Sequence, residues 1–200
     1  MRLFLFAASW PLPAFISAQH RIEARSLRIN CTNNLRPLGL LLKTWSLEHE
    51  GKFPMQALGQ PGTPTNYMES AQVFRYFQVM SNELAYPKVL ICPSDTRVPA
   101  SDLVNGFSNS NLSYFLGLDS VDTNPQMFLT GDRNLTNGPL PSNRILVLNT
   151  NYPVGWTTEM HHYQGNMGLA DGSVQQYSDS RLAEALRNIS YTNRNRLAMP

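Results

Sequence analysis

An Asp-Gly pair near the C-terminal end constrains the fold of this chain more than any other feature of its sequence. Asp171-Gly172 separates two short runs that carry apolar residues: Met167 and Leu169, then Val174 and Tyr177. Asp-Gly in this setting predicts a two-residue β-hairpin, because such a turn needs a positive φ at both central positions. His161 stands just before the first predicted strand, with nine residues between it and Asp171.

Length and composition predict one globular domain with an appendage. The 200 residues can bury a core of reasonable size, and 42% of them are apolar, which argues against disorder. Only 15% are charged and the net charge is +2, so the composition does not favour nucleic acid as a partner.

The first 18 residues have the shape of a short secretory signal. One basic residue, Arg2, precedes the apolar run 3–8, and small residues follow near Ser17 and Ala18. The run is too short, and too broken by prolines at 11 and 13, for a membrane span. An apolar N-terminus partly buried in the domain is the alternative.

A long amphipathic helix is predicted from about residue 14 to residue 48. Its apolar positions recur at threes, fours and sevens: Phe15, Ile22, Leu27, Cys31, Leu35, Leu38, Leu41, Leu42 and Trp45. Its other face is basic: Arg21, Arg25, Arg28, Arg36 and Lys43. A proline inside a helix loses a hydrogen bond, so we expect a kink or restart at Pro37, with Asn33 or Asn34 as the cap of the second piece.

The remainder of the chain predicts an α+β head. Loops rich in Pro, Gly and Asn separate the expected elements: a helix at 69–84, strands at 88–92, 112–117, 126–130 and 145–148, the Asp-Gly hairpin, and a helix at 180–187. The predicted organisation is a segment 1–18, an N-terminal helix 14–50, a head 51–190 and a loose tail 191–200. The fold class is therefore a long N-terminal helix packed on a mainly antiparallel sheet.

Five short elements, in order, resemble a known bacterial family. They are Cys31-Thr32-Asn33-Asn34-Leu35-Arg36-Pro37-Leu38-Gly39, Gly51-Lys52-Phe53-Pro54, Cys92-Pro93-Ser94-Asp95, Ser113-Tyr114, and His161 followed after nine residues by Asp171-Gly172. Together they are similar to the proteins with a prepilin-type cleavage and methylation N-terminus, related to type II secretion pseudopilins. The family's Gly-Phe-Thr-Leu-Ile-Glu processing site does not occur in this sequence, whereas Pro13-Ala14-Phe15 resembles the end of its membrane segment.

The resemblance implies a non-catalytic structural subunit of the cell envelope. Its expected partners are like subunits or secretion and pilus assembly proteins, with a membrane contact through the N-terminus and no nucleic acid. Its location would be the inner membrane, the periplasm or the outside of the cell. The basic helix face is a solvated face, or else meets anionic lipid or a neighbouring subunit. The alternative function is a secreted or periplasmic binding module, for instance for glycans, that reuses the pilin-like head.

Catalysis by His161 is the weakest alternative. Asp171 and a serine would have to complete a triad, but no Gly-x-Ser-x-Gly motif accompanies any serine. We predict instead that His161 hydrogen-bonds the hairpin or the strand beside it and fixes the register, so that its removal lowers thermal stability. In this interpretation His161, Asp171, Gly172, Cys92, Pro93 and Asp95 are structural signature residues.

No metal or other cofactor is predicted. Asp119, Asp122 and Asp132 are candidate calcium ligands, and some pseudopilins that resemble this chain bind calcium, but the spacing matches no known calcium loop. His161 and His162 are adjacent and would face apart on a strand, which makes them a poor zinc pair.

Two cysteines, Cys31 and Cys92, leave two states open. In an exported chain a disulfide between them would tie the helix to the sheet across 61 residues and stabilise the fold by about 3–4 kcal/mol. Two buried thiols are the other state, since free cysteine is among the most buried residue types.

Overall fold

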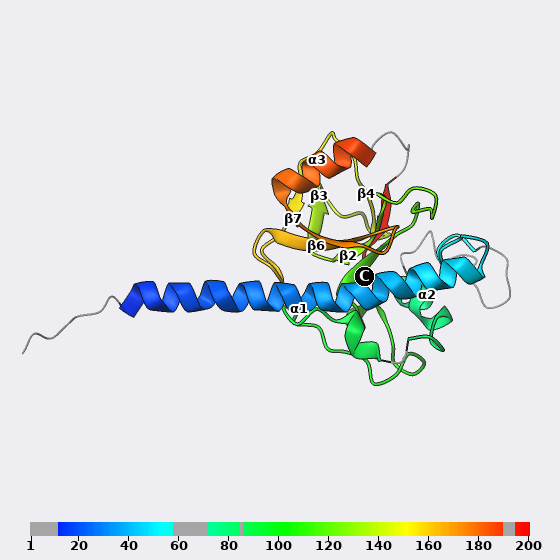
Figure 1. Ribbon diagram of the computed structural model, residues 1–200, viewed down its shortest axis with the longest axis horizontal. Coiled ribbons are helices and arrows are strands. Elements are labelled where there is room, and N and C mark those ends of the chain that lie inside the picture. The colour runs from blue at the N-terminus through cyan, green and yellow to red at the C-terminus, as the bar shows by residue number, and fades with distance from the viewer. Residues whose placement is uncertain (1–11, 58–71, 85, 190–194) are drawn as a thin grey trace, which may run out of the picture.

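The computed structural model describes residues 12–57, 72–84, 86–189 and 195–200 (Figure 1). A six-stranded antiparallel sheet lies between two helices, α1 (Leu12–Glu48) and α3 (Asp179–Ile189). This arrangement confirms the predicted α+β class with a mainly antiparallel sheet. The expected segment 1–18 lies largely outside the described residues, as do residues 69–71 and 191–194.

Strand order in the main sheet is β4-β8-β1-β2-β6-β7. The strands are β1 (Tyr114–Gly117), β2 (Phe128–Asp132), β4 (Ile145–Val147), β6 (Gln164–Leu169), β7 (Val174–Ser178) and β8 (Arg196–Ala198). Two further strands, β3 (Leu135–Asn137) and β5 (Val154–Trp156), pair as a separate ribbon that the sequence did not predict. A short helix α2 (Val73–Val79) and two 3-10 turns, η2 (Pro87–Leu90) and η3 (Asn109–Asn111), complete the described elements.

One stripe of α1 packs on the sheet. Its buried positions are spaced by four and three residues: Cys31, Leu35, Leu38, Leu42 and Trp45. This spacing keeps one face of a helix turned toward the same surface. The helix continues through Pro37, so the predicted restart is wrong. Pro37 and Asn33, one turn before it, are both exposed, so water can satisfy the carbonyl that loses its partner.

The Asp-Gly hairpin forms between β6 and β7, but its turn differs from the prediction. The loop has three residues, 170–172, and only Gly172 has a positive φ, of 84°. The amide of Gly172 donates to the carbonyl of Leu169 at 2.9 Å, and the amide of Leu169 donates to the backbone carbonyl of Ser173 at 2.8 Å. A tight turn followed by one left-handed residue needs a single glycine, whereas the two-residue turn needs two positive φ values.

Two further predictions are wrong. Residues 88–92 do not form a strand, because Pro87 opens a 3-10 turn there and the carbonyl of Leu90 makes one isolated bond with the amide of Ser113. The tail is not loose where it is described, because β8 lies between β1 and β4 inside the sheet. Its residues Leu197 and Ala198 are buried.

Candidate functional site

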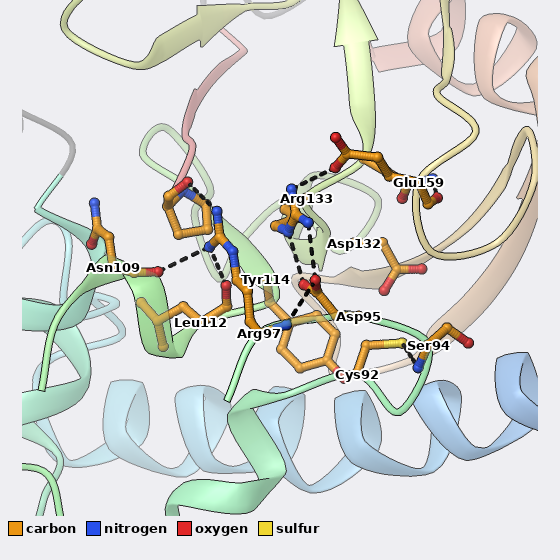
Figure 2. Close-up of polar contacts among 12 residues, drawn as sticks. Cys92, Ser94, Asp95, Arg97, Asn109, Leu112, Tyr114, Asp132, Arg133 and Glu159 are labelled. Carbon is orange, nitrogen blue, oxygen red and sulfur yellow. Dashed lines mark hydrogen bonds and ion pairs between the residues drawn. The ribbon is translucent and has the colours of Figure 1, made fainter. Parts of the chain in front are cut away.

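Four buried side chains that can bind protons or metals converge between α1 and the sheet. Cys31 comes from α1, Cys92 from the loop after η2, Asp132 from the end of β2, and His161 from the loop before β6. One ligand atom from each lies within 4.8 Å of the others, and all four residues are buried. Figure 2 shows Cys92 and Asp132 above α1. We call these four residues the Cys-Asp-His cluster.

Helix periodicity, sheet register and a tight turn bring three of the four residues inward. Cys31 occupies a buried position of the α1 stripe. Asp132 is paired with Tyr114 across β1 and β2, and both are fully buried. Cys92 begins a tight turn in which the amide of Asp95 donates to its carbonyl at 2.9 Å, with Pro93 in the second position that suits its fixed φ.

The backbone around His161 is held in an uncommon conformation. Met160, His162 and Tyr163 have φ values of 61°, 49° and 59°, the left-handed region that side chains other than glycine seldom adopt. Each such residue costs roughly 1–2 kcal/mol. The surrounding structure therefore holds this loop in a strained form, and His161 points into the cluster while His162 is exposed.

Asp132 is the hydrogen-bond acceptor at the centre of the cluster. Its Oδ1 accepts from Cys31 Sγ at 2.9 Å. Its Oδ2 accepts from the backbone amide of Asn166 at 2.7 Å and from Asn166 Nδ2 at 2.9 Å. Thr32 Oγ1, next along α1, donates to Asn166 Oδ1 at 3.0 Å. The amide of Asn166 thus links β2 to α1.

His161 uses one ring nitrogen toward the cluster. Its Nε2 lies 3.2 Å from Cys92 Sγ, 3.3 Å from Asp132 Oδ2 and 3.4 Å from Asn166 Nδ2. Its Nδ1 is buried and has no hydrogen-bond partner among the residues that the structure describes. The contact with Asn166 on β6 is of the kind predicted for a register-fixing histidine, although the contact alone does not test that role.

Burial and mutual contacts shift the pKa values of the cluster in opposite directions. The hydrogen bond with Cys31, supported by the contact with His161, lowers the pKa of Cys92 to about 5 against the effect of burial. Burial and the contact with Cys92 raise the pKa of Cys31 well above its usual value. Burial raises the pKa of Asp132 to about 7, although the charge of His161 opposes it.

For His161, burial alone would lower the pKa, but the contact with Cys92 and the charge of Asp132 outweigh burial and raise it. The lowered pKa of Cys92 and the raised pKa of His161 both favour a thiolate beside an imidazolium. Such a pair resembles an activated nucleophile and its base. Cys92 is fully buried, however, so its sulfur is not presented to a substrate.

A second polar network adjoins the cluster and contains Asp95. Asp95 receives two bonds from Arg133, Nε to Oδ2 at 2.8 Å and Nη2 to Oδ1 at 2.9 Å, while Arg133 Nη1 reaches Glu159 Oε2 at 2.6 Å (Figure 2). Arg97 donates to the carbonyls of Asn109, Leu112 and Pro200, which ties the C-terminal end to the head.

The structure separates the three calcium candidates. Asp119 pairs with Arg196, and Asp122 pairs with Lys43. Only Asp132 joins other metal-ligating side chains, and its neighbours are two thiols and an imidazole rather than the carboxylates calcium prefers. Asp171 is in the hairpin turn, where its Oδ1 accepts from the amide of Ser173 at 2.8 Å.

Sequence reasoning treated the cysteine pair and the histidine as separate features and missed the cluster. Cys31, Cys92 and His161 fall in the family-like elements, which was the one signal available, whereas Asp132 falls in none of them. Both cysteines are free thiols in this structure, and the disulfide, one of the two states that the sequence left open, stays untested. The cluster geometry is compatible with that bond, with a buried ion pair, or with a bound metal ion.

Comparison with protein-family models, curated protein sequences and solved structures finds no match to this chain. What the chain does must therefore be inferred from its own residues and geometry.

Proposed function

We propose that the chain is a non-catalytic, pseudopilin-like structural subunit of the bacterial cell envelope. In this proposal α1 packs against the corresponding helices of like subunits, and the head is displayed outward. The proposal draws on the five sequence elements that resemble type II secretion pseudopilins. The observation that carries it is a second apolar stripe on α1.

This second stripe lies on the face of α1 turned away from the head. Its members are between 46% and 70% exposed: Ile22, Ile29, Leu40 and Leu47. Successive members are 7, 11 and 7 residues apart, which corresponds to about two, three and two helical turns. The four side chains therefore form one row about 38 Å long at 1.5 Å per residue.

A row of this kind differs from the scattered apolar residues that every protein surface carries. Packing between helices uses ridges of side chains on each partner. The four positions supply apolar contacts along one such ridge, with the exposed Asn33 and Arg36 between Ile29 and Leu40. In Figure 1 the N-terminal part of α1 extends beyond the head, where a neighbouring helix could reach it. No helix within the described residues is both long and apolar enough to cross a membrane.

An apolar groove continues the row near the end of α1. Its volume is about 460 Å³, and the lining includes Leu40, Leu41, Trp45, Leu84 and Tyr86. Leu40 belongs to both features, and Tyr86 is also exposed. The groove could seat a side chain from a neighbouring helix, so it adds to the surface that assembly would bury.

Cysteine crosslinking tests the proposal. Leu47→Cys places a thiol on the row, and Val104→Cys places one at an equally exposed position on the head. The native thiols are buried, so mild oxidation of the full chain should link only the introduced ones. We expect dimers of Leu47→Cys in excess over Val104→Cys, and we expect Leu40→Asp in the same chain to abolish the excess. Equal crosslinking of the two variants would reject the proposal.

One observation favours the alternative binding module. A polar pocket of about 440 Å³ lies beside β7 and α3, and its lining combines side-chain amides with a ring and charges: Asn124, Gln126, Gln175, Asn188, Tyr177, Arg181 and Glu184. Amides and an aromatic ring suit a polyhydroxylated ligand. Titration of the full chain with neutral oligosaccharides, followed by NMR, should shift the amide signals of Gln126 and Gln175 if this is the function. Unchanged spectra would remove it.

A further inference from the structure

We propose that Cys31, Cys92, Asp132 and His161 form a tetrahedral binding site for a divalent transition metal, with Zn²⁺ the best match. The site would join α1 to three segments of the head. It goes beyond the proposed structural function, because an envelope subunit can assemble with or without a metal.

The distances already approach those of a tetrahedral site. Bond lengths of about 2.3 Å to sulfur and 2.0 Å to nitrogen or oxygen put tetrahedral ligand atoms roughly 3.3–3.8 Å apart. In the cluster Cys31 Sγ is 2.9 Å from Asp132 Oδ1, and His161 Nε2 is 3.2 Å from Cys92 Sγ and 3.3 Å from Asp132 Oδ2. Every ligand atom lies within 4.8 Å of the others, and the shortest of these separations would have to widen around a metal ion.

The ligand set selects the kind of metal. Two thiols, one imidazole and one carboxylate combine soft and borderline donors. Ca²⁺ and Mg²⁺ take oxygen ligands almost alone, whereas Zn²⁺ binds cysteine, histidine and aspartate in four-coordinate sites. With both thiols ionised and His161 neutral, the ligands carry three negative charges. A divalent cation would offset two of them in a place that water does not reach.

Neighbouring groups are placed to hold three of these ligands: Cys31, Cys92 and Asp132. The amide of Ser94 donates to Cys92 Sγ at 3.4 Å, and Tyr114 Oη lies 3.4 Å from Cys31 Sγ, so each sulfur has a donor beside it. Asn166 holds Asp132 Oδ2 with two hydrogen bonds, which orients Oδ1 toward Cys31. Outer donors of this kind fix metal ligands in their orientation.

The strained loop supplies an independent argument. Three non-glycine residues with positive φ surround His161, and their strain must be offset by what the loop achieves. What it achieves in this structure is to aim Nε2 between Cys92 and Asp132. A metal ion bound between Cys92 and Asp132 would lie in the direction in which Nε2 points.

Metal uptake by the reduced full chain tests the site. The chain is stripped with a chelator under a thiol-free reductant and then titrated with Co²⁺ and with Zn²⁺. We expect one Co²⁺ per chain, with intense visible absorption typical of tetrahedral coordination and a thiolate-to-cobalt charge-transfer band. Zn²⁺ should displace it and raise the melting temperature. This readout on the unaltered chain does not depend on whether a variant folds.

Matched variants identify the ligands. Cys92→Ser should remove the charge-transfer intensity of one thiolate, and His161→Gln should weaken Zn²⁺ binding at least about 10-fold. His162→Gln changes the adjacent, exposed histidine and should bind as the unaltered chain does. The proposal is overturned if the reduced chain takes up no stoichiometric metal, if its Co²⁺ spectrum lacks a thiolate band, or if His162→Gln loses the metal as readily as His161→Gln. If the chain is isolated with a Cys31–Cys92 disulfide and takes up no metal after that disulfide is reduced, the proposal is overturned as well.

Discussion

Arg133 offers an internal comparison between a buried and an exposed ion pair, and this gives the sharpest prediction. The guanidinium holds Asp95, whose side chain is 0% exposed, with two hydrogen bonds. On its other side it holds Glu159, whose side chain is 57% exposed, with one. Asp95→Asn and Glu159→Gln each remove one negative charge and keep the shape of the side chain, so they differ mainly in burial.

The expected costs follow from that burial. Breaking a buried pair destabilises by about 3–5 kcal/mol, because it leaves a charge without its partner. The side-chain amide introduced by Asp95→Asn can still accept one bond from Arg133, so we expect the lower end, about 3 kcal/mol. An exposed pair contributes about 0–1 kcal/mol, so Glu159→Gln should lower the free energy of unfolding by no more than about 1 kcal/mol. In a chain of 200 residues these losses correspond to melting temperatures lower by about 6–12 °C and by less than about 4 °C.

The same pair predicts a dependence on acid. Burial would raise the pKa of Asp95, but the hydrogen bonds and charge of Arg133, with the Ser113 hydroxyl and a hydrogen bond from the Arg97 amide, outweigh it, and the pKa lies below its ordinary value of 3.8. A lowered pKa contributes stability that is present above the ordinary value and is lost as the pH falls through the value in the folded state. The gap in unfolding free energy between the unaltered chain and Asp95→Asn should therefore be constant near neutral pH and shrink below about pH 4.

Urea unfolding monitored by circular dichroism at several pH values measures both effects. Similar losses for Asp95→Asn and Glu159→Gln at pH 7 would refute the assignment of the stability to burial. A gap that stays unchanged down to about pH 2.5, well below the ordinary carboxyl pKa, would refute the assignment to the ionised carboxylate.

Three further predictions concern the fold and the cluster. A methyl group on Gly117 would overlap the backbone carbonyl of Phe128 on the facing strand, so Gly117→Ala should cost about 3 kcal/mol in urea unfolding. In Gly106→Ala the new methyl group meets no described atom within 4 Å, and the φ of 70° alone should cost about 1 kcal/mol. Deleting residues 196–200 removes a strand that is paired on both edges, so the shortened chain should lose its cooperative thermal transition, and a melting curve like that of the full chain would contradict this. His161→Leu should lower the melting temperature of the metal-free chain because it leaves buried polar partners unpaired, and the exposed His162→Leu should change it little.

Elements whose pattern reflects one buried face were predicted well. The α1 stripe from Cys31 to Trp45 follows from the helical period, which records burial directly. The strands on both sides of Asp171-Gly172 follow from the turn signal between them. Predictions failed where the local pattern is short or ambiguous. Residues 88–92 are a mostly apolar run that can form a strand or a turn. Residues 196–198 are too few to show a strand period in the sequence, and only their pairing with β1 and β4 makes them a strand.

The Cys-Asp-His cluster could not be predicted in the same way. Its members are separated by 61, 40 and 29 residues, and no local pattern connects a helix position, a turn, a strand end and a strained loop. Sequence by itself determined which residues can carry such chemistry and where the buried stripe of α1 runs from Cys31 to Trp45, because side-chain type and helical period are local properties. It placed Ile22 on that stripe, whereas the structure leaves Ile22 70% exposed. Only the tertiary structure decided that Cys31, Cys92, Asp132 and His161 meet in one buried place, because that depends on strand register and on how α1 lies across the sheet.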